Sequence, residues 1–84
     1  AHVQAGATIG DLIETTTQYG LVTTTGTCSA VGMAGFTLGG GYSELTGAYG
    51  LGIDNLLSAQ VVTADGQLLT ANAEEHPDLL WGLR

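Results

Sequence analysis

The sequence predicts an α+β fold, in which helices pack on a small mixed sheet. Three observations support this class: apolar residues at helical spacing near the start of the chain, a β-hairpin signal around residue 65, and a second helical pattern at the end. No repeat and no internal boundary divides the chain, so we expect residues 1–84 to lie within a single domain.

Two helices are predicted. The first covers residues 8–19, with Thr8 as a suitable N-cap and Gly20 free to adopt the left-handed conformation past its end. One face of this helix carries apolar side chains at the spacing of a buried stripe: Ile9, Leu12 and Ile13. The second helix starts at Pro77, a favourable first helical position. Its apolar face consists of Leu79, Leu80 and Leu83.

Four segments favour extended structure. Residues 2–5 alternate polar and apolar side chains, and residues 21–24 are rich in β-branched side chains. Residues 57–63 have the composition of a strand, and residues 67–70 are the expected return strand. The Asp65-Gly66 pair between them is a strong signal for a tight hairpin turn.

Residues 25–52 contain nine of the chain's 14 glycines. Apolar residues are interleaved with them, which distinguishes this segment from a flexible linker: Val31, Met33, Phe36, Leu38 and Leu45. So many glycines indicate backbone that is pressed against another group or that repeatedly needs a positive φ angle. A short helix starting near residues 29–31 would add positive potential there.

Composition excludes several classes of protein. A hydrophobic content of 44% argues against a disordered acidic tail, and a net charge of −7 argues against a nucleic-acid or anionic-membrane surface. Residues 19–43 carry no charge but are too rich in Gly and Thr for a transmembrane helix. The single cysteine cannot form an internal disulfide.

Common catalytic and metal-binding motifs are missing. No G-x-G-x-x-G stands between a strand and a helix, no G-x-S-x-G is present, and the absence of lysine excludes a Walker loop. His2 and His76 lie far apart in the sequence, and no ligand spacing surrounds Cys28, so we expect no metal site.

Residues 26–42 read G-x-C-x-x-V-G-x-x-G-x-x-x-G-G-G-Y, and residues 49–55 read Y-G-L-x-x-D-N. In these motifs the sequence resembles the FAD-binding, PCMH-type domain of the vanillyl-alcohol-oxidase superfamily, and within it the berberine-bridge-enzyme-like oxidases. Residues 3–7, 61–66 and 77–81 fit the same family, so the resemblance covers nearly the whole chain.

The resemblance implies that the chain is a partial FAD-binding domain, truncated at both ends, of an oxidase acting on a small-molecule substrate. Such enzymes oxidise an alcohol or amine carbon by hydride transfer to the flavin, with O₂ as acceptor; the fragment alone would be inactive. Cys28 matches the cysteine that bonds to flavin C6. The expected cofactor-binding residues are Thr27, Cys28, Ser29, Val31, Gly32, Met33, Gly35, Gly39, Gly40, Gly41 and Tyr42.

The resemblance leaves the catalytic residues unassigned, because the base and the substrate pocket come largely from a later domain. The R-x-G-G-H motif, whose histidine supplies a second tether, lies upstream in the family and is absent from residues 1–84, and His2 lies in the wrong context to replace it. Phe36 stands where family members often carry a histidine that contacts the cofactor, and Thr46-Gly47-Ala48 lacks the arginine often found before Y-G-L.

Alternative interpretations remain open at this point. The flavin fold could persist as a binding or structural module without oxidase activity, or FAD could bind without a bond to Cys28. Cys28 could be an inert core residue, and Gly39-Gly40-Gly41 could form only a tight turn. For Asp54-Asn55, a turn or capping pair is favoured over a catalytic acid.

Overall fold

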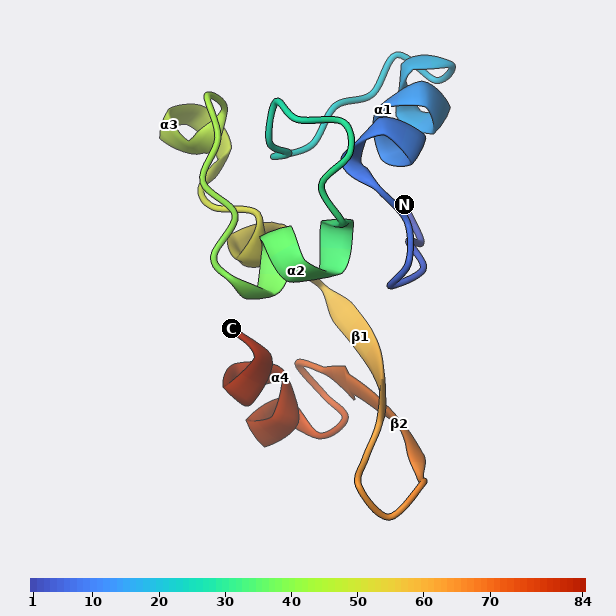
Figure 1. Ribbon diagram of the computed structural model, residues 1–84. Coiled ribbons are helices and arrows are strands. Elements are labelled where there is room, and N and C mark those ends of the chain that lie inside the picture. Colours follow the sequence, from blue (N-terminus) through green and yellow to red (C-terminus); the bar gives the residue numbers. More distant parts are fainter.

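The computed structural model describes all residues, 1–84, and confirms the α+β class. Figure 1 shows α1, α2 and α3 at one end and a β-hairpin with α4 beside it at the other. The elements in chain order are α1 (Ile9–Thr17), α2 (Met33–Leu38), α3 (Thr46–Tyr49), the 3₁₀ turn η1 (Ile53–Asn55), β1 (Ser58–Val62), β2 (Leu68–Asn72) and α4 (Pro77–Leu83). None of the helices is long and apolar enough to span a membrane.

Thr8 caps α1 and Gly20 follows its end, as predicted, although the helix ends at Thr17 rather than near Tyr19. The Asp11 N–H donates to the Thr8 hydroxyl (3.2 Å), and the Thr8 N–H donates to the Asp11 carboxylate (2.8 Å), which together form a capping box. The Thr8 hydroxyl also donates to the Asp11 carboxylate. The bond from the Thr8 N–H and, after it, the bond from the Thr8 hydroxyl stabilise the charged carboxylate and lower the pKa of Asp11. Past the last turn, Gly20 has a φ of 63°, in the left-handed region that glycine tolerates.

The sheet is smaller than expected, because it consists of β1 and β2 alone and is antiparallel rather than mixed. The register pairs Ser58 with Asn72 and Val62 with Leu68, and Gly66 has a φ of 81° in the turn between them, as the hairpin signal predicted. Residues 2–5 and 21–24 form no strand. A strand needs a neighbour for its N–H and C=O groups, and no segment of residues 1–84 pairs with either.

The prediction of a helix that starts near residues 29–31 is also wrong, since α2 begins only at Met33. Its backbone groups are used elsewhere. The Ser29 carbonyl accepts from the Gly10 N–H, while the Met33 N–H, which a helix would direct to Ser29, donates to the Ala7 carbonyl (2.9 Å). Contacts with the start of α1 therefore replace the first helical turn.

The hydrophobic core is small and joins α1 to α2. Ile9, Leu12 and Met33 are buried together, and the partly buried ring of Phe36 packs against them. At the other end, Leu80 of α4 is buried beside β2. Ten of the 84 residues are buried in all, and 13 large hydrophobic side chains are exposed.

Candidate functional site

Cys28 opens an exposed turn that is fastened to the start of α1. The Val31 N–H donates to the Cys28 carbonyl (3.2 Å), which closes the turn. Two N–H groups of the first helical turn hold it in place: Ile9 donates to the Val31 carbonyl (2.8 Å), and Gly10 donates to the Ser29 carbonyl (2.9 Å). We call residues 28–31 the Cys28 turn. Its thiol is free and exposed, so Cys28 is not a core residue.

Backbone N–H groups around the Cys28 turn are available to a ligand. The N–H groups of Thr27, Cys28, Ser29 and Ala30 donate to no acceptor within the chain, and all four residues are exposed. The only Lys or Arg side chain is Arg84, whose guanidinium lies 3.8 Å from the Asp54 carboxylate. Within residues 1–84, the groups that could hold an anion beside Cys28 are therefore backbone amides.

Two glycines after the Cys28 turn leave the backbone uncovered. A Cβ atom built on Gly32 or Gly35 would meet no atom within 4 Å, so packing within the chain does not require glycine at these positions. Met33, between them, is buried and only 9% exposed. Its side chain packs into the core, whereas the neighbouring glycines face open space.

The Gly39-Gly40-Gly41 segment ends α2 with two residues in conformations that favour glycine. Gly40 has a φ of 105° and Gly41 a φ of 77°. Their carbonyls accept from the Ile53 N–H (3.1 Å) and the Gly52 N–H (2.8 Å), which fixes this segment against η1. Tyr42, next in the chain, is 79% exposed and presents an uncovered aromatic ring.

Phe36 connects the segments before and after α2. A Cβ atom on Gly26, Gly41 or Gly52 would lie within 3.2 Å of its ring, so three glycines surround the ring edge. From the sequence, Phe36 was recognised as one of the apolar residues interleaved with the glycines and as a departure from the family pattern, but this packing role was missed. Because the ring packs against the core, the side chain at position 36 is directed inward in this chain.

Asp54 and Asn55 stabilise the loop before β1, in agreement with the favoured interpretation as a capping pair. The Asp54 carboxylate accepts from the Leu51 N–H (2.9 Å). The Asn55 amide donates to the carbonyls of Leu51 (2.8 Å) and Tyr49 (3.0 Å) and, more weakly, to the Thr24 hydroxyl (3.4 Å). These hydrogen bonds engage the side chains of Asp54 and Asn55 in stabilising the loop.

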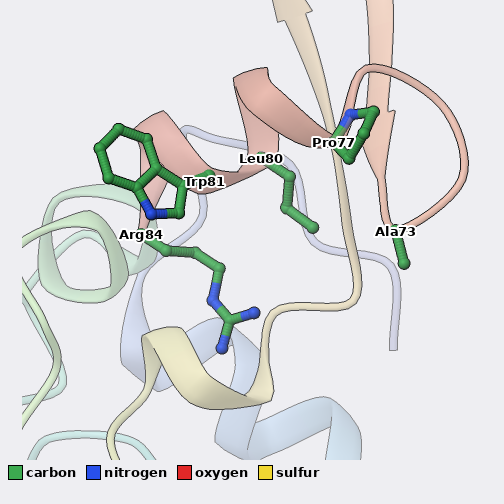
Figure 2. A pocket seen from close by; sticks show the side chains of 5 residues that line it. All are labelled: Ala73, Pro77, Leu80, Trp81 and Arg84. Carbon is green, nitrogen blue, oxygen red and sulfur yellow. The ribbon is translucent and has the colours of Figure 1, made fainter.

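Two cavities lie apart from the Cys28 turn. A pocket of about 320 Å³ beside α4 is lined by Ala73, Pro77, Leu80, Trp81 and Arg84 (Figure 2). A larger, mostly apolar hollow of about 870 Å³ lies between the N-terminal segment, α2 and β1, and Met33 is its only lining residue among the predicted site residues. No group of three or more His, Cys, Asp or Glu side chains is arranged to hold a metal ion.

Gly10 is a further residue that sequence analysis missed. A Cβ atom at this position would lie 3.2 Å from both the Cβ and the carbonyl oxygen of Ser29. Glycine in the first turn of a helix is unfavourable for helix formation, and this was the only signal in the sequence that the position has a special role.

Comparison with known proteins identifies the family. A family model described as FAD binding domain matches residues 1–72. FAD-linked oxidoreductase ZEB1 of Gibberella zeae is 47% identical over 81 residues, which cover 95% of this chain. Two solved structures share the fold: the carbohydrate oxidase from Microdochium nivale (TM-score 0.95, 38% identity, 99% of this chain) and Physcomitrella patens BBE-like 1 (TM-score 0.93, 41% identity, 98% of this chain).

The chain spans only a small part of each of these proteins: 14% of the Gibberella relative and 18% of each solved structure. Within that part, the alignments cover 95% to 99% of this chain, at identities of 38% to 47%. The chain belongs to the FAD binding domain family, and its fold is that of the berberine-bridge-enzyme-like flavoproteins of the vanillyl-alcohol-oxidase superfamily.

Proposed function

We propose that this chain is the part of a longer FAD-linked oxidoreductase that holds the flavin. The protein would oxidise an alcohol or amine carbon of a small-molecule substrate and use O₂ as the electron acceptor. The observation that carries this proposal is the family match over residues 1–72, which includes the exposed Cys28 turn. When bound, FAD would accept a hydride from the substrate carbon and pass the electrons to O₂.

The residues of the site suit the cofactor. The pyrophosphate and the polar edge of the flavin ring need hydrogen-bond donors, and the free N–H groups of residues 27–30 supply them without a basic side chain. A flat ring also needs close access to the backbone. Gly32 and Gly35 allow this access, and because packing within the chain leaves their Cβ positions open, a bound ligand is a physical reason for glycine there.

Cys28 would tether the flavin. The proposed bond joins its Sγ atom to ring carbon C6; the thiol and C6 each give up one hydrogen, and O₂ takes both and becomes hydrogen peroxide. The attacking species is the thiolate, which needs an uncovered sulfur. The exposed thiol of Cys28 meets this requirement. We propose no catalytic base among residues 1–84, because Asp54 and Asn55 are engaged in the loop before β1.

The test uses the full-length protein. It should purify with flavin absorbance, keep that absorbance in the acid-precipitated pellet, and produce hydrogen peroxide with a member of a panel of sugars, secondary amines and benzylic alcohols. A protein that remains free of flavin after incubation with FAD would instead support a structural module. Flavin that acid releases completely would contradict the tether but leave the oxidase proposal standing.

A further inference from the structure

The start of α1 and the Cys28 turn are in unusually close contact. The Gly10 N–H donates to the Ser29 carbonyl at 2.9 Å, and the Ile9 N–H donates to the Val31 carbonyl at 2.8 Å. With a side chain at position 10, a Cβ atom would lie 3.2 Å from the Ser29 Cβ and 3.2 Å from the Ser29 oxygen. Both separations are shorter than ordinary carbon contacts, so one of the two segments would have to move.

The Cys28 turn is the segment that would move. Ile9 and Leu12 anchor α1 in the core, with 1% and 6% of their surfaces exposed, and the capping box fixes its first turn. Ser29, in contrast, is exposed and is attached through its carbonyl alone. Because the bond between Val31 and Cys28 closes the turn, a displacement of Ser29 would also displace the neighbouring Cys28.

We propose that Gly10 is a positioning residue for Cys28: its missing side chain lets α1 hold the turn at the place from which the thiol reaches the flavin. This inference rests on the tether proposed above. Gly10 would act through its contacts with Ser29. Its effect on the rate of tether formation comes from a small shift at Ser29, and rates of bond formation respond strongly to small misplacements.

The experiment follows tether formation in the full-length protein prepared without flavin and then mixed with FAD. Samples are denatured at intervals and digested with chymotrypsin, since the chain contains no Lys or Arg before Arg84; cleavage after Leu21 and Phe36 gives peptide 22–36. Gly10→Ala should form the flavin–peptide bond roughly tenfold more slowly or worse. Non-covalent FAD binding, followed by quenching of flavin fluorescence, should change less than about twofold.

Two controls separate positioning from loss of stability. Gly6→Ala changes a nearby glycine whose Cβ position has no atom within 4 Å, so its tethering rate should equal that of wild type. Leu80→Ala removes a buried side chain far from the turn and lowers stability without moving Ser29. Its rate should also equal that of wild type. Equal slowing by Gly10→Ala and Leu80→Ala would overturn the positioning role.

A double variant keeps the inference testable even where Gly10→Ala folds poorly. Ser29→Gly removes the Cβ atom that the new methyl group at position 10 would contact, so Gly10→Ala should slow tethering less in this background than in wild type. Equal rates for wild type and Gly10→Ala, with the wild-type peptide modified, would overturn the inference alone. An unmodified wild-type peptide would overturn the proposed tether itself.

Discussion

The ring of Phe36 lies so close to Gly41 that a Cβ atom at position 41 would be 3.0 Å from its Cε1 atom. The same ring edge approaches Gly52, whose N–H donates to the Gly41 carbonyl at 2.8 Å. Phe36 thus joins α2 to the glycine segment after it and to the loop before β1. The proposed flavin surface is therefore shaped by one inward-facing aromatic ring and the glycines around it.

Gly41→Ala should destabilise the domain by about 2 kcal/mol, because the new Cβ would meet both the Phe36 ring and the Gly52 backbone at a φ of 77°. The apparent unfolding temperature of the full-length protein is the measurement. Gly47→Ala is the matched control, since α3 is exposed there and no atom lies within 4 Å of the added Cβ. Equal unfolding temperatures for the two variants would contradict this account of the glycine packing.

Asn55→Asp should lower the free energy of unfolding, measured with urea, by about 2 kcal/mol. The amide donates to the carbonyls of Leu51 and Tyr49, and a carboxylate would place acceptors against those oxygens. Gln18→Ala, which removes an exposed amide that makes no hydrogen bond through its side chain, should change stability by less than about 0.5 kcal/mol. If Asn55→Asp unfolded at the wild-type urea concentration, these hydrogen bonds would have no structural importance.

The capping box of α1 predicts a dependence of stability on pH. The Thr8 N–H and hydroxyl lower the pKa of Asp11 in the folded state. The contribution of this carboxylate to the stability of the fold is therefore fully present above the ordinary carboxyl pKa and is lost as the pH falls through the lowered pKa. The protection of the first-turn amides of α1 against hydrogen exchange, corrected for the intrinsic pH dependence of exchange, should therefore fall in acid. Asp11→Asn should show faster exchange at neutral pH and less change on acidification; the wild-type response in this variant would contradict the prediction.

An isolated polypeptide of residues 1–84 should neither unfold cooperatively nor bind FAD tightly. Only ten residues are buried, and large apolar side chains such as Leu57 (84% exposed) and Trp81 (81% exposed) remain uncovered. Calorimetry and FAD titration measure both properties. A sharp thermal transition together with micromolar FAD affinity would contradict the prediction that the rest of the protein is required.

Features that depend on a few neighbouring residues could be predicted from the sequence. Thr8 and Gly20 marked the ends of α1, and Asp65-Gly66 marked the turn between β1 and β2. Residues 2–5 and 21–24 also have strand composition, but composition does not supply a partner, and none is present in residues 1–84. The local pattern therefore identified the hairpin but overestimated the sheet.

The candidate site could be predicted in part, because the motif around Cys28 is contiguous in the sequence. The contact that holds the Cys28 turn could not be predicted, because Gly10 and this turn lie far apart along the chain and meet only through backbone bonds. Phe36 was recognised as an apolar residue among the glycines and as a departure from the family pattern, but the contacts of its ring with three of those glycines could not be predicted, because no periodicity reveals them.

The mass of peptide 22–36 from the denatured full-length protein tests the central claim most directly. This peptide contains Cys28, the only cysteine of the chain, so an added flavin mass identifies one sulfur without ambiguity. We expect this peptide at its own mass plus that of FAD less two hydrogens, and Cys28→Ala should abolish this species. An unmodified peptide from folded protein that contains flavin would contradict the assignment of Cys28 as the tether.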